Sequence, residues 1–309
     1  MILAAGLSPA WQQILLFDRL RTGEVNRARE SHWCASGKVL NVAVAARSLV
    51  RETTVAAISV LGGTTGNLIE EEFRTLGVQL SKIETRAPTR VCTTLLDRQT
   101  GVTTELVENA RAMQEAEWEE YLVEFQRIGP SAEICVFTGS LPQSTPADFL
   151  PRLNDAAAAR WILDIRGSDL MGLLPRRPWM VKPNREELAE TFERDLTREE
   201  NLQQAMRELL EMGAESVLIT RGNASALLAF GEELWRFTPP KVTTVNPIGC
   251  GDCLAAGIAV ATHEGADLIE AVRFGMGAAA HNAEQLLPAR LKRARVEELV
   301  GQVQAMRVP

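Results

Sequence analysis

Short apolar segments alternate with longer amphipathic segments along most of this chain. Buried strands are predicted where β-branched and aromatic residues cluster between turn residues, at 53–59, 133–139, 160–165, 179–184 and 216–222. Helical periodicity between these runs predicts helices over 66–76, 114–127, 146–159 and 198–212. This βαβ alternation predicts an α/β fold, with a doubly wound, mostly parallel sheet flanked by helices.

Two regions interrupt the alternation. Residues 11–35 and 90–108 each have the pattern of two strands around a turn, with no crossover helix. They predict a small antiparallel sheet beside the main one, acting as a lid or a dimer surface. The C-terminal part has helical patterns at 252–264, 267–286 and 296–306. Because we find no repeat or linker, we expect a single domain over residues 1–309.

Composition narrows the class of function. The net charge is −7, so broad nucleic-acid binding is not expected. No apolar run approaches the roughly 18–20 residues of a membrane span, and the N-terminus lacks the basic region of a signal peptide. Five cysteines are an odd count in a long chain, which argues against a disulfide framework. We therefore expect a cytoplasmic protein.

The segment VNPIGCGDCLAAG (245–257) carries the most informative motif. Gly249 and Gly251 let successive N–H groups point at one spot, and a helix N-terminus adds partial positive charge. These features predict an anion hole at 249–251 suited to a phosphoryl group. Asp252 beside it is interpreted either as a base that takes a proton from an attacking alcohol or as a simple helix cap.

Two other segments add candidate polar groups. Gly37 and Lys38 precede an amphipathic helix, so Lys38 could reach an anion and Asn41 a hydroxyl, although helices often start this way. The spacing is not that of a P-loop. Asn184 and Glu187 lie three apart after a strand, which suits a hydrated Mg²⁺ or ordinary helix capping.

The motif also contains a Cys-x-x-Cys pair, Cys250 and Cys253. A thiol at a helix N-terminus is expected to have a lowered pKa, and this spacing is typical of thiol oxidoreductases. Both cysteines are alternatively small packing residues, and the carboxylate of Asp252 would oppose thiolate formation. A hypothesis of inhibition by oxidants or Zn²⁺ follows from the first interpretation.

Several segments in order resemble the PfkB family, the ribokinase-like carbohydrate kinases. The resemblance is greatest to the branch of 1-phosphofructokinases and tagatose-6-phosphate kinases, and it runs nearly end to end. The matching segments are LSPAW, GEVNR, SGKVLNVA, LGGTTG, TGSLP, LDIRG, VKPNREEL and NPIGCGD.

The resemblance implies a role for each matching residue. Asp252 would be the catalytic base, with Gly249, Cys250 and Gly251 forming the anion hole. ATP and Mg²⁺ would be the cofactors. Thr220, Gly222, Asn184 and Asn282 would contact the nucleotide. Asn184 and Glu187 would hold the metal through water. The sugar phosphate would be bound by Gln12, Gly37, Lys38, Asn41, Arg90 and Arg27. The lid implies a homodimer, in which Arg27 would reach the site of its own subunit or that of the partner subunit.

Five positions depart from the branch: Gln12, Ser36, Val39, Cys92 and Arg166. Gln12 stands where the branch has an aspartate, and an amide donates as well as accepts hydrogen bonds. Val39 adds bulk where glycine is usual, and Cys92 stands where related kinases often carry asparagine. Because most of these changes fall on the substrate side, they indicate an altered substrate rather than lost catalysis.

The sequence thus predicts an ATP-dependent kinase that acts on a primary hydroxyl of a ketohexose phosphate: fructose 1-phosphate, fructose 6-phosphate or tagatose 6-phosphate. Three alternatives stay open: a kinase of an unphosphorylated sugar or nucleoside, a non-catalytic sugar or nucleotide sensor, and a thiol oxidoreductase. A Rossmann dehydrogenase is not expected, because no Gly-x-Gly-x-x-Gly follows the first strand.

Overall fold

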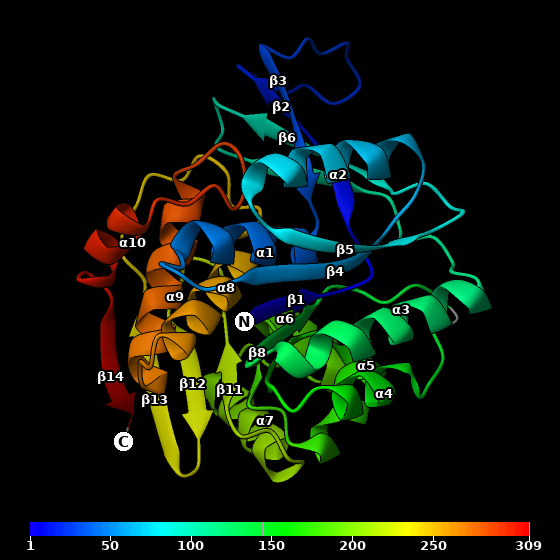
Figure 1. Ribbon diagram of the computed structural model, residues 1–309. Coiled ribbons are helices and arrows are strands. Elements are labelled where there is room, and N and C mark those ends of the chain that lie inside the picture. The colour runs from blue at the N-terminus through cyan, green and yellow to red at the C-terminus, as the bar shows by residue number, and fades with distance from the viewer. Residues whose placement is uncertain (144, 309) are drawn as a thin grey trace.

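The computed structural model describes residues 1–143 and 145–308. Its main feature is a ten-stranded sheet in the order β14-β13-β12-β11-β10-β9-β8-β1-β4-β5 (Figure 1). The strands from β11 to β5 in this order are parallel, and β12, β13 and β14 are antiparallel. Their bounds are β1 (Ile2–Ala5), β4 (Val55–Leu61), β5 (Gln79–Glu84), β8 (Ile134–Thr138), β9 (Arg160–Asp164), β10 (Met180–Val181), β11 (Val217–Ile219), β12 (Ala226–Phe230), β13 (Glu233–Thr238) and β14 (Gln304–Val308).

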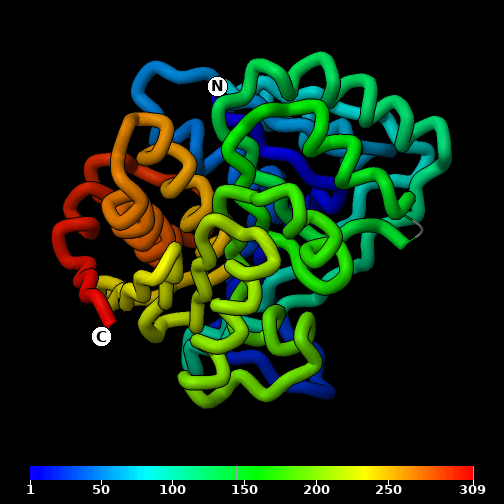
Figure 2. The backbone as a smooth tube through the Cα atoms, turned by 90° about the horizontal axis from the view of Figure 1, so that it is seen from below, coloured from blue at the N-terminus to red at the C-terminus, as the bar shows by residue number. Residues whose placement is uncertain are grey.

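Helices cover both faces of this sheet (Figures 1 and 2). One core contains buried side chains of α1 (Lys38–Leu49), α2 (Gly63–Leu76), α8 (Cys250–His263), α9 (Leu268–Ala283) and α10 (Arg293–Val300). The other contains those of α3 (Glu115–Ile128), α4 (Phe149–Ala156), α5 (Gly167–Leu173), α6 (Arg185–Phe192) and α7 (Glu199–Glu211). The central strand β1 contributes side chains to both cores, because successive side chains of a strand point to opposite faces.

The predicted α/β architecture is confirmed, with three local corrections. The helix predicted over 146–159 begins at Phe149, which leaves Pro151 in the first turn, where its missing N–H is tolerated. The helix predicted over 296–306 ends at Val300, and the chain then forms β14, paired antiparallel with β13. Strands β5 and β13 and helix α5 were not predicted.

The two segments predicted as lid strands form a separate four-stranded sheet, which we call the small sheet. Its order is β3-β2-β6-β7, and it stands above α2 in Figure 1. Two antiparallel pairs, β2 with β3 and β6 with β7, are joined by a parallel pairing of β2 with β6. The strand bounds are β2 (Ala10–Phe17), β3 (Glu30–Ser36), β6 (Val91–Asp97) and β7 (Thr103–Val107).

No helix of the described chain, residues 1–143 and 145–308, is long and apolar enough to cross a membrane.

Candidate active site

A cleft of about 350 Å³ lies between the small sheet and the carboxyl ends of the parallel strands. In open α/β sheets the carboxyl ends of the strands are the usual place for a ligand. Most of the predicted site residues line this cleft: Gln12, Gly37, Lys38, Asn41, Arg90, Asn184, Glu187, Thr220, Gly249, Cys250, Gly251 and Asp252.

The start of helix α8 forms one wall of the cleft. Gly249 is the N-cap residue with φ +84°, a left-handed conformation that glycine adopts without strain. A Cβ at Gly249 would also lie 3.0 Å from Cβ of Pro288. The first N–H groups of a helix have no partner within it, and they carry the positive end of the helix dipole. The wall is therefore suited to an anion.

Asp252 is buried in the first turn of α8. Its Oδ2 accepts a 2.8 Å hydrogen bond from Nδ2 of Asn41, and Ser36 Oγ donates to Oδ1 of the same amide. Burial raises the pKa of Asp252 to about 6; the positive charge of Lys38 opposes this rise. The N-cap position belongs to Gly249, so Asp252 is not the simple cap of the alternative interpretation. With this pKa the carboxylate is largely ionised at neutral pH, which is the state that a proton acceptor requires.

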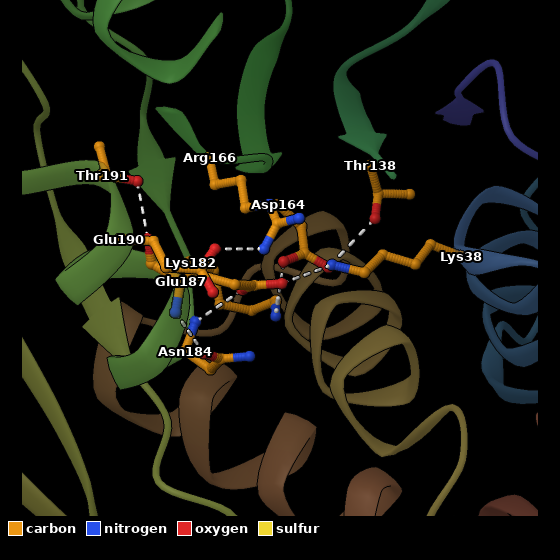
Figure 3. Close-up of polar contacts among 9 residues, drawn as sticks. All are labelled: Lys38, Thr138, Asp164, Arg166, Lys182, Asn184, Glu187, Glu190 and Thr191. Carbon is orange, nitrogen blue, oxygen red and sulfur yellow. Dashed lines mark hydrogen bonds and ion pairs between the residues drawn. The ribbon is translucent and has the colours of Figure 1, made fainter. Parts of the chain in front are cut away.

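Asp164, at the end of β9, lies between two lysines (Figure 3). Its Oδ1 is 3.2 Å from Nζ of Lys182, and its Oδ2 is 3.5 Å from Nζ of Lys38. The hydroxyl of Thr138 donates to Oδ2 at 3.1 Å. Burial opposes ionisation of Asp164, but the two lysines hold its pKa below the usual value. Since the carboxylate is charged, it fixes both ammonium groups at the cleft.

Lys38 has a second acidic partner, because its Nζ also lies 3.2 Å from Oε1 of Glu187. Burial alone would lower the pKa of Lys38, but the carboxylates of Asp164, Glu187 and Asp252 together raise it above the ordinary value. The ammonium group is thus a permanent positive charge next to the proposed anion wall.

Asn184 and Glu187 form a capping box at the start of α6. Oδ1 of Asn184 accepts from the N–H of Glu187, and Oε2 of Glu187 accepts from the N–H of Asn184. Both side chains also line the cleft, so capping and a cation site are compatible. Amide and carboxylate oxygens are ligands that suit Mg²⁺, which retains several waters. No cluster of three or more acidic, His or Cys side chains forms a ready cage within the described residues.

Arg90 lies at the rim of the cleft. Its guanidinium donates to the carbonyls of Ser8, Pro9 and Glu108, which leaves two of its five N–H groups for a ligand. Arg27 is exposed in the connection between β2 and β3 and does not line the cleft. The prediction that Arg27 contacts substrate therefore has no support within one copy of the chain.

The predicted nucleotide residues separate into two groups. Thr220 follows β11 and lines the cleft, whereas Gly222 lies in the β11–β12 turn with φ +61° and does not. Asn282 is fully buried, and its amide is committed to the chain: Nδ2 donates to Ile248 O, and Oδ1 accepts from the N–H of Ala289. We therefore reassign Asn282 from a nucleotide contact to a residue that positions the loop before α8.

The small sheet covers the cleft with alternate residues of its strands. Gln12, Cys92, Glu105 and Val107 line the cleft from this side. Nε2 of Gln12 donates to Oγ1 of Thr94 at 2.8 Å, so the amide is fixed within the sheet.

The bulky Val39 that departs from the family pattern is accommodated by a glycine. A Cβ at Gly6 would lie 2.9 Å from Cβ of Val39, closer than real Cβ contacts. Val39 itself is buried beside the main sheet.

The two cysteines of α8 do not have the expected activated thiols. Burial raises the pKa of Cys250 to about 11, and burial also raises the pKa of Cys253 well above its usual range. Both are free thiols, and each contacts the amide of Asn282. The predicted lowering of the thiol pKa is wrong, because burial outweighs the helix N-terminus. The packing interpretation fits these contacts.

Sequence reasoning did not single out Asp164, Lys182 or Glu105. Asp164 is the last residue of a buried strand and Lys182 directly follows another, and a charged residue at that point was an available signal. Neighbouring parallel strands end at the same edge of a sheet, so these two side chains meet. Glu105 had no such signal, because its side of the small sheet depends on strand register.

Comparison with known proteins places the chain in a family. Residues 12–290 match the model of the pfkB family of carbohydrate kinases. A 1-phosphofructokinase of Bacillus subtilis (strain 168) is 30% identical over 292 residues, which cover 93% of this chain and 94% of the relative.

Solved structures agree with this assignment. Phosphofructokinase-2 from Escherichia coli in complex with fructose-6-phosphate is 25% identical, with a TM-score of 0.86 over 97% of this chain and 99% of that chain. A ribokinase from Thermotoga maritima, 22% identical, shares the fold, with a TM-score of 0.77 over 97% of this chain and 99% of that chain. The chain therefore belongs to the PfkB family of carbohydrate kinases and has the ribokinase-like fold that its sequence predicts.

Proposed function

We propose that this kinase transfers the γ-phosphoryl group of ATP to a primary hydroxyl of a phosphorylated ketohexose. The observation that carries the proposal is the buried carboxylate of Asp252 at the anion wall, held by Asn41 and with a pKa of about 6. The 1-phosphofructokinase relative and the relative bound to fructose-6-phosphate support this substrate class.

The reaction follows from these positions. Asp252 accepts the proton of the sugar hydroxyl as its oxygen forms a bond to the γ-phosphorus. The bond between that phosphorus and its bridging oxygen breaks, and ADP leaves with the electron pair. The N–H groups of residues 249–251 and the ammonium groups of Lys38 and Lys182 stabilise the charge on the transferring group.

Asn184 and Glu187 are the residues that would hold Mg²⁺, through water, near the phosphates of ATP. The cation would supply charge neutralisation for the phosphoryl oxygens. Thr220, on the same side of the cleft, is the proposed nucleotide contact. Gln12, Gly37, Asn41 and Arg90 are the proposed sugar-phosphate contacts.

We further propose that the small sheet is a lid and that two copies pair through its other face. The row Trp33–Gln13–Thr93–Leu106 crosses the four strands on the side away from Gln12. Trp33 stacks on Trp11 and is 44% exposed, and Leu106 is 56% exposed.

Trp33→Glu should shift a dimer to a monomer in light scattering after gel filtration. An unchanged mass, or a monomeric parent protein, would reject this interface.

Coupled ATP turnover with Mg²⁺ tests the function. The panel contains fructose 1-phosphate, fructose 6-phosphate, tagatose 6-phosphate, fructose, ribose and adenosine. We expect strong turnover of one phosphorylated ketose. No turnover of any panel member, with ATP still bound, would instead indicate a sensor.

A kinase of an unphosphorylated sugar is the second candidate. The ion pairs of Lys38 with Asp164 and Glu187 favour it, because they engage one of the two predicted phosphate-binding cations. Turnover restricted to an uncharged sugar would select this candidate. An unchanged KM for the sugar phosphate in Arg90→Ala would also argue for it.

A further inference from the structure

Glu105 brings a carboxylate to the lid side of the cleft. It lies on β7, where it is the cross-strand neighbour of Thr94, which in turn is opposite Ile14 of β2. Glu105 lines the cleft together with Gln12 and Arg90. Its position is therefore across the cleft from the lysines and Asp252, on a strand that the proposed mechanism does not use.

The carboxylate of Glu105 has no partner in the structure. Within residues 1–143 and 145–308, no hydrogen bond or ion pair engages it. Glu105 is exposed to solvent at the edge of the cleft; desolvation by the surrounding protein raises its pKa, and the charge of Arg90 opposes this rise. Arg90 does not pair with it, because the guanidinium is directed at the carbonyls of Ser8, Pro9 and Glu108.

The neighbouring amide of Gln12 does not hydrogen-bond to Glu105, so the carboxylate is free to accept from a ligand in the cleft. Nε2 of Gln12 donates to Thr94 rather than to Glu105. An ionised carboxylate only accepts hydrogen bonds, so its ligand must be a donor. A sugar phosphate offers hydroxyl donors, whereas its phosphate group would be repelled by the negative charge.

We propose that Glu105 accepts a hydrogen bond from a hydroxyl of the sugar and so determines which sugar the kinase selects. The proposal rests on the proposed function. It also accounts for Gln12, where the branch has an aspartate. An aspartate accepts hydrogen bonds only, whereas the amide of Gln12 both donates and accepts, so position 12 no longer provides an acceptor-only group. Glu105 supplies that group from β7, the edge strand two positions from β2 in the small sheet.

The test uses the full-length protein with Glu105→Gln and Glu105→Ala. Glu30→Gln is the matched control, because Glu30 is on the small sheet but does not line the cleft. We expect KM for the sugar phosphate to rise about 10- to 100-fold in the Glu105 variants, the range for a hydrogen bond to a charged group. KM for ATP should be unchanged, and kcat should change much less. The control should match the parent protein.

Monodeoxy analogues of the accepted sugar phosphate identify the hydroxyl. For the parent protein, the analogue that lacks the hydroxyl bound by Glu105 should have a higher KM than the complete sugar phosphate. In Glu105→Ala the two KM values should be similar. Unchanged KM in both Glu105 variants, or a full set of deoxy penalties in Glu105→Ala, would overturn the inference and leave the proposed function intact. A parent protein that phosphorylates no sugar phosphate would overturn the proposed function and this inference with it.

Discussion

Asn41 donates a 2.8 Å hydrogen bond to Oδ2 of Asp252, although the two residues lie 211 positions apart in the sequence. The contact joins the first turn of α1 to the first turn of α8. Ser36 fixes the amide of Asn41 from the other side, so the lone pairs of the carboxylate point in a defined direction. The proposed base is thus oriented by residues from the N-terminal part of the chain.

The first prediction concerns pH. A base must be deprotonated, so kcat/KM should fall as the pH drops below about 6, the pKa of Asp252. The bond from Asn41 favours the ionised form, and Asn41→Ala should therefore raise this pKa and move the acid limb to higher pH. Profiles of kcat/KM for the parent and variant proteins measure both effects. An acid limb that stays in place or moves to lower pH would contradict the assignment.

The second prediction concerns stability. The pKa of Asp252 in the folded protein, about 6, exceeds its ordinary value of 3.8. The raised pKa contributes to the free energy of unfolding below pH 4, where Asp252 is protonated. This contribution is lost as the pH rises through 6, because the buried carboxyl group must then ionise. The side chain of Asp252→Asn cannot ionise, so the variant should have a free energy of unfolding about 3 kcal/mol higher than the parent protein at pH 8. The gain should shrink at pH 5 and vanish below pH 4. Urea unfolding at these pH values measures it, and a gain that does not depend on pH would refute the explanation.

The third prediction concerns the Asp164 ion pairs. Asp164→Asn leaves the buried ammonium group of Lys182 without its partner, and it should destabilise the protein by about 3–5 kcal/mol. The double variant Asp164→Leu with Lys182→Met removes both charges and should recover much of that loss. Denaturant unfolding compares the two. Equal stabilities would mean that the unpaired lysine carries no penalty.

The fourth prediction concerns the cysteines. With a pKa of about 11, Cys250 has a thiolate fraction at pH 8 roughly 100-fold below that of a thiol with the ordinary value of 9. Labelling by Ellman's reagent should therefore be slow in the folded protein and fast after denaturation. Cys250→Ala should retain kcat within about threefold, since the hole uses backbone N–H groups. Rapid labelling of Cys250, or inhibition by diamide with a 250–253 bridge, would restore the redox hypothesis.

Much of the fold was predictable because its signals are local. Buried strands such as β4 and β8 are apolar runs between turn residues, and the glycines around Cys250 mark the start of α8. The error at β14 has a non-local cause. Residues 304–308 have little burial of their own and become a strand only by pairing along β13.

The site was predictable where one short motif contains the chemistry. Asp252 and its glycines are contiguous, so the anion wall follows from the sequence. The meeting of Asp164 with Lys182 instead depends on strand order, because β9 and β10 must be neighbours. The reassignment of Asn282 depends on the path of the loop around Ala289, which no local pattern reveals.

The most direct test of the account compares the parent protein with Asp252→Asn on the sugar phosphate that the panel selects. ATP binding is measured by calorimetry, and phosphoryl transfer is measured in a single turnover at pH 7.5. We predict that ATP binding is unchanged and that transfer is slower by about 10²- to 10⁴-fold, the usual contribution of a general base. Transfer at the parental rate would show that Asp252 is not the base and would contradict the central claim.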